Sequence, residues 1–166
     1  MANKRDFTPE EWTMVLQSPM LVGIAISTAD PSGLWGTLKE AAASSSALAA
    51  AKLDAGSNDL IKAVIGDIET SEGRTVVQKA LRDCFAGAEP SHCVHRSLAN
   101  LREVSLVLDA KAPDDAAGFK TWLCGISQKV AEASAEGAFL GLGGVQVSDA
   151  EKATLADISK ALGMAT

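Results

Sequence analysis

Residues 19–51, PMLVGIAISTADPSGLWGTLKEAAASSSALAAA, decide the fold that we expect for this chain. The stretch is rich in Gly, Ala and Ser, and its charged residues are Asp30, Lys39 and Glu40. Small residues allow helices to pack closely, and proline disfavours the helical conformation of the residue before it. The stretch therefore predicts the buried centre of a helical bundle, with one helix giving way to the next at Asp30-Pro31.

The two halves of this stretch differ in what they can bury. In the first half Gly23 and Ser27, and likewise Ala25 and Ala29, stand four residues apart, so small residues line neighbouring faces of one helix. Residues 41–51 have no bulky side chain apart from Leu48. We expect the first half to pack tightly in the core, whereas the second half packs there or presents a flat surface to a partner subunit.

The N-terminal region carries clear helix-start signals. Thr8-Pro9-Glu10-Glu11 has the pattern of a capping box with proline in the first turn, and Phe7 can pack on Trp12. Ser18-Pro19 repeats the combination of a capping residue and a proline. The sequence thus predicts a short first helix, a second helix from Pro19 and a third from Asp30-Pro31 to about Ala55.

Five more helices are expected along the rest of the chain, because apolar residues recur there at three- and four-residue spacing. Their expected starts are Asn58 or Ser57, a point after the break at 71–74, Ser91, Pro113 and the capping box Ser148–Glu151. Gly56, Gly87 and Gly163 are expected helix ends. We therefore predict one all-α domain over residues 1–166, a bundle of about seven or eight helices, some of them short.

Composition and charge exclude several classes of function. The chain has 166 residues and a formal net charge of −6, which disfavours contact with a nucleic-acid backbone. The longest uncharged run, Pro19–Ala29, is shorter than the ~20 apolar residues of a spanning helix. A signal peptide has an apolar run directly after its basic residues, and the N-terminal basic residues of this chain are not followed by one. We expect a cytoplasmic protein without a membrane span.

The chain has three cysteines, Cys84, Cys93 and Cys124, an odd number without CxxC spacing. This pattern argues against a disulfide framework. Free cysteine behaves as a small hydrophobic residue, so mostly buried thiols are expected.

The two histidines, His92 and His95, stand three residues apart at an expected helix start. Their imidazoles could reach one metal ion, with Cys84 as a further ligand. The alternative is that both are solvated histidines in a polar first turn. Glu89-Pro-Ser-His92 is the chain's one Glu-x-x-His pattern, whereas a di-iron centre needs two, so that centre is excluded.

The loop from Gly137 to Gly144, GAFLGLGG, is rich in glycine but lacks the context of a phosphate-binding loop. A strand before it and a following Gly-Lys-Ser/Thr are both missing. Its Phe139 and Leu140 suggest apolar plugs that anchor the chain across the end of the bundle, or a partner contact. No nucleophile motif surrounds any Ser or Cys, and no cofactor is predicted.

A resemblance covers most of the chain. Asp30-Pro-Ser-Gly33, the loop Glu136–Gly144 and Val147-Ser-Asp-Ala-Glu151 resemble a group of small, uncharacterised bacterial all-helical proteins. The resemblance implies an all-α fold and a bacterial cytoplasmic setting. It implies no activity and no site residues.

These observations lead to three functional hypotheses. The first is a non-enzymatic helical bundle that acts through association with a protein partner or with itself, as a homo-oligomer. The second is a bundle that binds a metal or small ligand through His92 and His95, with Cys84. The third is an enzyme with a site between helices.

Overall fold

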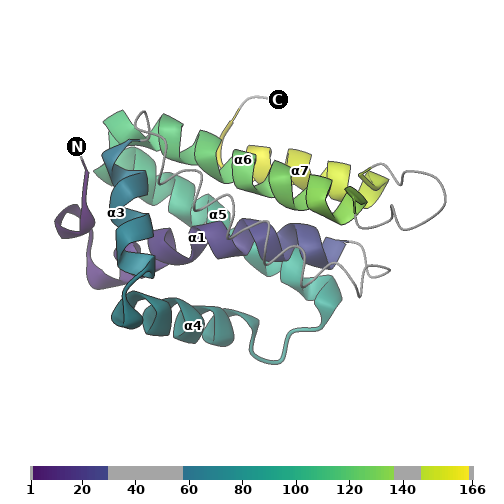
Figure 1. Cartoon of the computed structure of the whole chain (residues 1–166), viewed down its shortest axis with the longest axis horizontal. Helices are drawn as coiled ribbons and strands as arrows, with labels where there is room; N and C mark the ends of the chain where they lie inside the picture. The colour runs from purple at the N-terminus through teal and green to yellow at the C-terminus, as the bar shows by residue number, and fades with distance from the viewer. Residues whose placement is uncertain (1, 30–57, 137–146, 165–166) are drawn as a thin grey trace.

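Six α-helices and a short 3-10 helix make up the part of the chain that the computed structural model describes, residues 2–29, 58–136 and 147–164 (Figure 1). They are η1 (Lys4–Asp6), α1 (Pro9–Ala29), α3 (Asp59–Ile68), α4 (Ser71–Phe85), α5 (Pro90–Lys111), α6 (Pro113–Glu136) and α7 (Asp149–Ala161). No strand occurs among these residues, which confirms the all-α prediction for them. The predicted third helix, residues 41–51 and the 137–144 loop lie outside the described residues.

The prediction of a helix break at Ser18-Pro19 was wrong, and this accounts for one of the helices missing from the predicted seven or eight. Helix α1 runs without interruption from Pro9 to Ala29, with Pro19 inside it. Proline has no N–H, so the carbonyl of Val15, four residues earlier, loses its usual helical donor. The buried hydroxyl of Ser18 donates to that carbonyl at 2.7 Å instead. Ser18, which was predicted to cap a new helix, therefore helps α1 to continue through Pro19.

Helix α1 lies in the middle of the bundle, with α5 beside it, α6 and α7 on one side and α4 on the other (Figure 1). Because it continues through Pro19, it is long and apolar enough to cross a membrane by length and composition alone. The bundle buries 61% of its most apolar window, and Val15, Leu21 and Val22 are completely covered. The buried core helix of a soluble protein and a signal sequence near the N-terminus both pass the same test.

The core combines the apolar stripes predicted for the later helices. The largest fully buried side chains are Phe119, Leu16, Leu21, Ile26, Leu60, Leu101, Leu108, Leu123, Ile126, Ile158, Leu162 and Val15. They come from α1, α3, α5 and α6 and from α7 with the residue after it. Aliphatic side chains therefore supply most of the core, and Phe119 is the aromatic residue among these twelve. Residues Gly23 and Ala25 of α1 are also buried, as close packing of the first half of the 19–51 stretch requires.

Hydrogen bonds confirm both predicted capping boxes, those at Thr8 and at Ser148. The amide of Glu11 donates to the Thr8 hydroxyl at 3.2 Å, while the Thr8 amide donates to the Glu11 carboxylate at 2.8 Å. Ser148 and Glu151 form the same reciprocal pair. Gly163 ends the last helix with a φ of +68°, a conformation that favours glycine. The predicted cap at Ser91 was wrong, because α5 already begins at Pro90 with Glu89 before it.

A tight corner joins α3 to α4 and turns α4 away from the other helices. The Thr70 hydroxyl accepts a hydrogen bond from the Gly73 amide at 2.9 Å, so Thr70 caps α4. A Cβ on Gly73 would lie 2.0 Å from the carbonyl oxygen of Asp67, so no larger residue fits without moving the corner. The break predicted at residues 71–74 is therefore the Glu69–Thr70 corner, and Gly73 lies inside the helix that follows.

The same corner is tied to the N-terminus through the carboxylate of Asp67. This carboxylate accepts hydrogen bonds from the Trp12 indole at 2.6 Å and from the Lys4 ammonium at 2.9 Å. Burial acts to raise the pKa of Asp67, but the bonds from Trp12 and Lys4 and the charge of Lys4 outweigh it, so the pKa lies below its usual value. The ionised form is thus favoured by the fold.

We predict that Asp67→Ala lowers the free energy of unfolding at pH 7 by about 2 kcal/mol, the usual worth of hydrogen bonds to a charged group. A lowered pKa gives stability that is complete above the unfolded-state value and is lost as the pH falls through the folded-state value. The difference between the variant and the original protein should therefore shrink below about pH 4. Urea denaturation across pH measures it. Asp83→Ala, which removes an exposed carboxylate of α4, is the control; equal stabilities of Asp67→Ala and the original protein would contradict the prediction.

Candidate functional site

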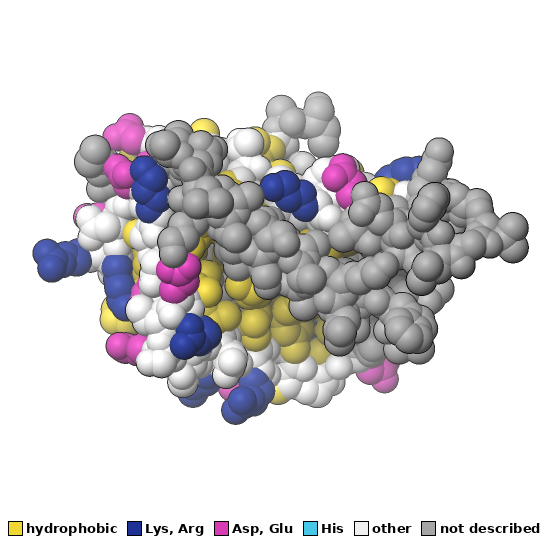
Figure 2. Space-filling view, in the orientation of Figure 1, with side chains coloured by type: hydrophobic (Ala, Val, Ile, Leu, Met, Phe, Trp, Pro, Cys, Tyr) yellow, Lys and Arg dark blue, Asp and Glu magenta, His cyan; other side chains and the backbone are white. Residues whose placement is uncertain are grey.

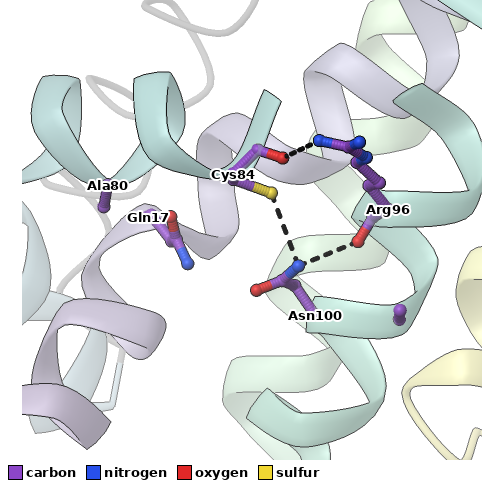
Figure 3. A pocket seen from close by; sticks show the side chains of 6 residues that line it. Gln17, Ala80, Cys84, Arg96 and Asn100 are labelled. Carbon is purple, nitrogen blue, oxygen red and sulfur yellow. Dashed lines mark hydrogen bonds between the residues drawn. The ribbon is translucent and has the colours of Figure 1, made fainter. Parts of the chain in front are cut away.

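An open pocket of about 440 Å³ lies between helices α1, α4 and α5 (Figure 3). Its lining residues are Gln17 from α1, Ala80 and Cys84 from α4, and Arg96, Ala99 and Asn100 from α5. The two alanines leave the space open, and the four other side chains bring an amide, a thiol, a guanidinium and a second amide to one place. This is the candidate functional site.

Gln17 is the most deeply buried polar group of the pocket. The continuous helix α1 carries it into the bundle, where only 4% of the residue is exposed. Its Oε1 atom has no hydrogen-bond partner in the described part of the chain. A buried polar atom without a partner costs about 1–3 kcal/mol, so Gln17 is unfavourable for stability unless something else binds to it.

Arg96 and Asn100 stand one helical turn apart on α5 and join it to the end of α4. The Nη1 of Arg96 donates to the Cys84 carbonyl at 2.8 Å and to the Ala86 carbonyl at 3.2 Å. These bonds give the carbonyls at the C-terminal end of α4 a donor. The Nδ2 of Asn100 donates to the Arg96 carbonyl at 2.9 Å and contacts the Cys84 sulfur at 3.5 Å. These bonds hold the α4 side of the pocket open at a defined distance from α5 (Figure 3).

The pocket presents a positive charge and a neutral thiol. Burial is the main reason that the pKa of Cys84 lies above its usual value, and the neighbouring Cys93 adds to the effect, although Arg96 and the bond from Asn100 oppose it. Cys84 is therefore protonated at neutral pH and is a poor nucleophile. No carboxylate of the described residues forms an ion pair with Arg96. No ion pair of the described residues therefore neutralises the positive charge that Arg96 brings to the pocket.

The predicted metal ligands do not share this site. His92 and His95 lie exposed in the first two turns of α5, and the pocket that Cys84 lines includes neither of them. Among the described residues no group of three or more His, Cys, Asp and Glu side chains is arranged to hold a metal ion. A metal at His92 and His95 stays a prediction. The thiols of Cys84, Cys93 and Cys124 are all free and half-buried, rather than mostly buried as predicted.

Sequence reasoning missed three of the polar residues of the pocket, Gln17, Arg96 and Asn100. The signal for Gln17 was a carboxamide that follows the apolar residues Val15 and Leu16, close to the predicted helix break at Ser18-Pro19. The signal for Arg96 and Asn100 was their four-residue spacing on the predicted sixth helix, which places both on one face. Neither signal could be joined to the other without knowing which helices are neighbours.

Comparisons with known proteins place no constraint on this site, since no family model, no curated protein and no solved structure matches the chain. Of the resemblance to small bacterial helical proteins, the all-helical architecture is what the structure supports.

We predict that Gln17→Met raises the free energy of unfolding by about 1 kcal/mol, because methionine has a similar shape and leaves no buried polar atom without a partner. Urea denaturation of the protein without added ligands measures the change. Gln78→Met, an exposed position on α4, is the control and should change stability little. A loss of stability in Gln17→Met would show that the Gln17 amide is bonded inside the fold.

Proposed function

We propose that this protein is a non-enzymatic helical bundle that acts by association with another protein, and that helix α4 is the surface it uses. One observation carries the proposal: the apolar stripe of α4 is incompletely covered. Val77 is buried, but Val76, Leu81 and Phe85 on either side of it are only half-buried.

The contrast with the neighbouring helices supports this choice of surface. The stripes of α5 and α6 are covered more completely than that of α4: Leu101 and Phe119 are fully buried, although Val94 and Trp122 are half-buried. Figure 2 shows hydrophobic side chains open to the viewer in the region between α4 and α1. An apolar stripe that the fold covers only in part is a candidate interaction site, because contiguous apolar surface marks such sites in proteins. Leu106 of α5 is more exposed, at 64%, but it lies between charged residues rather than in a stripe.

The charge on α4 favours a partner different from this chain. The helix carries three basic residues, Arg74, Lys79 and Arg82, and two acidic ones, in a chain whose net charge is −6. Two copies of the chain repel each other on average, whereas an acidic partner is attracted to this face. We therefore propose an amphipathic helix with acidic flanking residues, which places its apolar face on the stripe of α4.

The chemistry of the described residues supports a role without catalysis. The thiol of Cys84 is held neutral, and neither histidine lines its pocket. A nucleophile needs a base within hydrogen-bond reach, and the Cys84 sulfur instead accepts a hydrogen bond from the Asn100 amide.

The proposal predicts a partner that touches α4 and no other face. Incorporating the photo-crosslinking residue p-benzoylphenylalanine in place of Phe85 in living cells, followed by mass spectrometry, should join the chain to one other protein through an acidic amphipathic segment. The same crosslinker in place of Thr121, an exposed position on α6, should not. With both proteins purified, Leu81→Glu should weaken binding at least about tenfold and Leu106→Glu should not.

Two results would contradict the proposal. One is crosslinks from position 85 that join only copies of this chain, since they would assign the surface to self-assembly. The other is a yield from position 85 no higher than that from position 121.

A further inference from the structure

We propose that the pocket between α1, α4 and α5 binds a small organic carboxylate that also carries a hydrogen-bond donor, such as a 2-hydroxy acid, with Arg96 facing the carboxylate and Gln17 facing the donor. This inference goes beyond the association through α4. It rests on the polar residues that line the pocket, not on the apolar stripe of α4.

The first argument is the unsatisfied carboxamide of Gln17. Its Oε1 atom is an acceptor, is buried in the wall of the pocket and has no partner among the described residues. Buried acceptors in proteins nearly always have a donor, and an exception in a pocket suggests that the donor comes from a ligand. Because Oε1 is fully covered, the Gln17 amide must turn toward the pocket to accept a hydrogen bond from a hydroxyl or amino group of the bound molecule.

The second argument is the uncompensated charge of Arg96. Its Nη1 is occupied by two backbone carbonyls of the α4 end, which fixes the plane of the guanidinium. The remaining N–H groups and the full positive charge face no acid of the described residues. A planar guanidinium held in this way matches a carboxylate in geometry as well as in charge.

The remaining lining residues fit an anionic guest. Cys84 stays a neutral thiol and adds no negative charge that would repel a carboxylate. The Nδ2 of Asn100 donates to the backbone carbonyl of Arg96 and to the Cys84 sulfur, so this amide joins the α5 and α4 sides of the pocket (Figure 3). Ala80 and Ala99 provide a short apolar wall. The volume of about 440 Å³ lies in the range of about 300–1,000 Å³ that small-molecule sites occupy.

A titration of the full chain with 3-phenyllactate and with lactate, followed by proton–nitrogen NMR, tests the proposal. The side-chain signals of Gln17, Asn100 and Arg96 should shift in a saturable way with at least one acid. The neutral 3-phenyllactamide, which keeps the hydroxyl and the ring, should bind at least about tenfold more weakly than 3-phenyllactate if that acid binds. Gln17→Met should weaken binding at least about tenfold, and Gln78→Met should leave it unchanged.

Gln17→Met removes no bond that the fold makes, so a folded variant is expected, and its backbone spectrum checks this. Arg96→Lys is a second variant, which keeps the charge but loses the planar fork and should also weaken binding. The proposal is overturned if neither acid shifts the three side-chain signals up to about 10 mM, well above a millimolar dissociation constant. Equal binding by Gln17→Met, or an amide that binds as well as its acid, would overturn it too.

Discussion

The hydrogen bond from the Ser18 hydroxyl to the Val15 carbonyl is the interaction on which the rest of the bundle depends. A proline at position 19 removes the N–H donor that the Val15 carbonyl would have in a regular helix. Val15 and Pro19 are both buried, so water does not replace that donor. With the serine in place, α1 crosses the whole bundle as one helix. Every other described helix except η1 is arranged around it (Figure 1).

The continuity of α1 has a direct consequence for the pocket. Gln17 stands two residues before Pro19, so the pocket-lining residue with the buried, unpaired acceptor lies within the same helical turn as the proline. A helix that ended here would have its last carbonyls and side chains at a terminus, where water solvates them. Because the helix continues, Gln17 is enclosed by α4 and α5 instead. The Ser18–Val15 hydrogen bond thus supports both the continuous core helix and the position of Gln17 in the pocket wall.

The corner at residues 67–73 sets the other wall. Gly73 lets α4 start directly against the carbonyl of Asp67, and Asp67 in turn is anchored by Trp12 and Lys4. At its other end α4 is held by Arg96 of α5. Helix α4 is therefore fixed at its two ends while its apolar stripe is left half-covered. This arrangement gives a folded protein both an open pocket and an apolar surface.

Local signals in the sequence predicted the described helices well wherever the governing interaction is local. The capping boxes at Thr8 and Ser148 act within four residues, and the structure contains both. The prediction at Ser18-Pro19 was wrong because a serine before a proline can cap a new helix or can donate to the carbonyl that the proline leaves without a donor. Burial by distant helices decides between the two. The pocket could not be predicted for a related reason: Gln17, Cys84 and Arg96 come from three helices, and a charge or amide pattern within one helix does not reveal its neighbours.

A double-mutant cycle at Ser18 and Pro19 tests the central role of α1 most directly, with the free energy of unfolding measured in urea. Ser18→Ala should cost about 1–2 kcal/mol in the original chain, because the Val15 carbonyl is left without a donor. In the Pro19→Ala background the same change should cost almost nothing, since alanine restores the backbone N–H that bonds to this carbonyl. Equal losses in the two backgrounds would contradict the account, because they would mean that the serine does not stand in for the missing N–H of the proline.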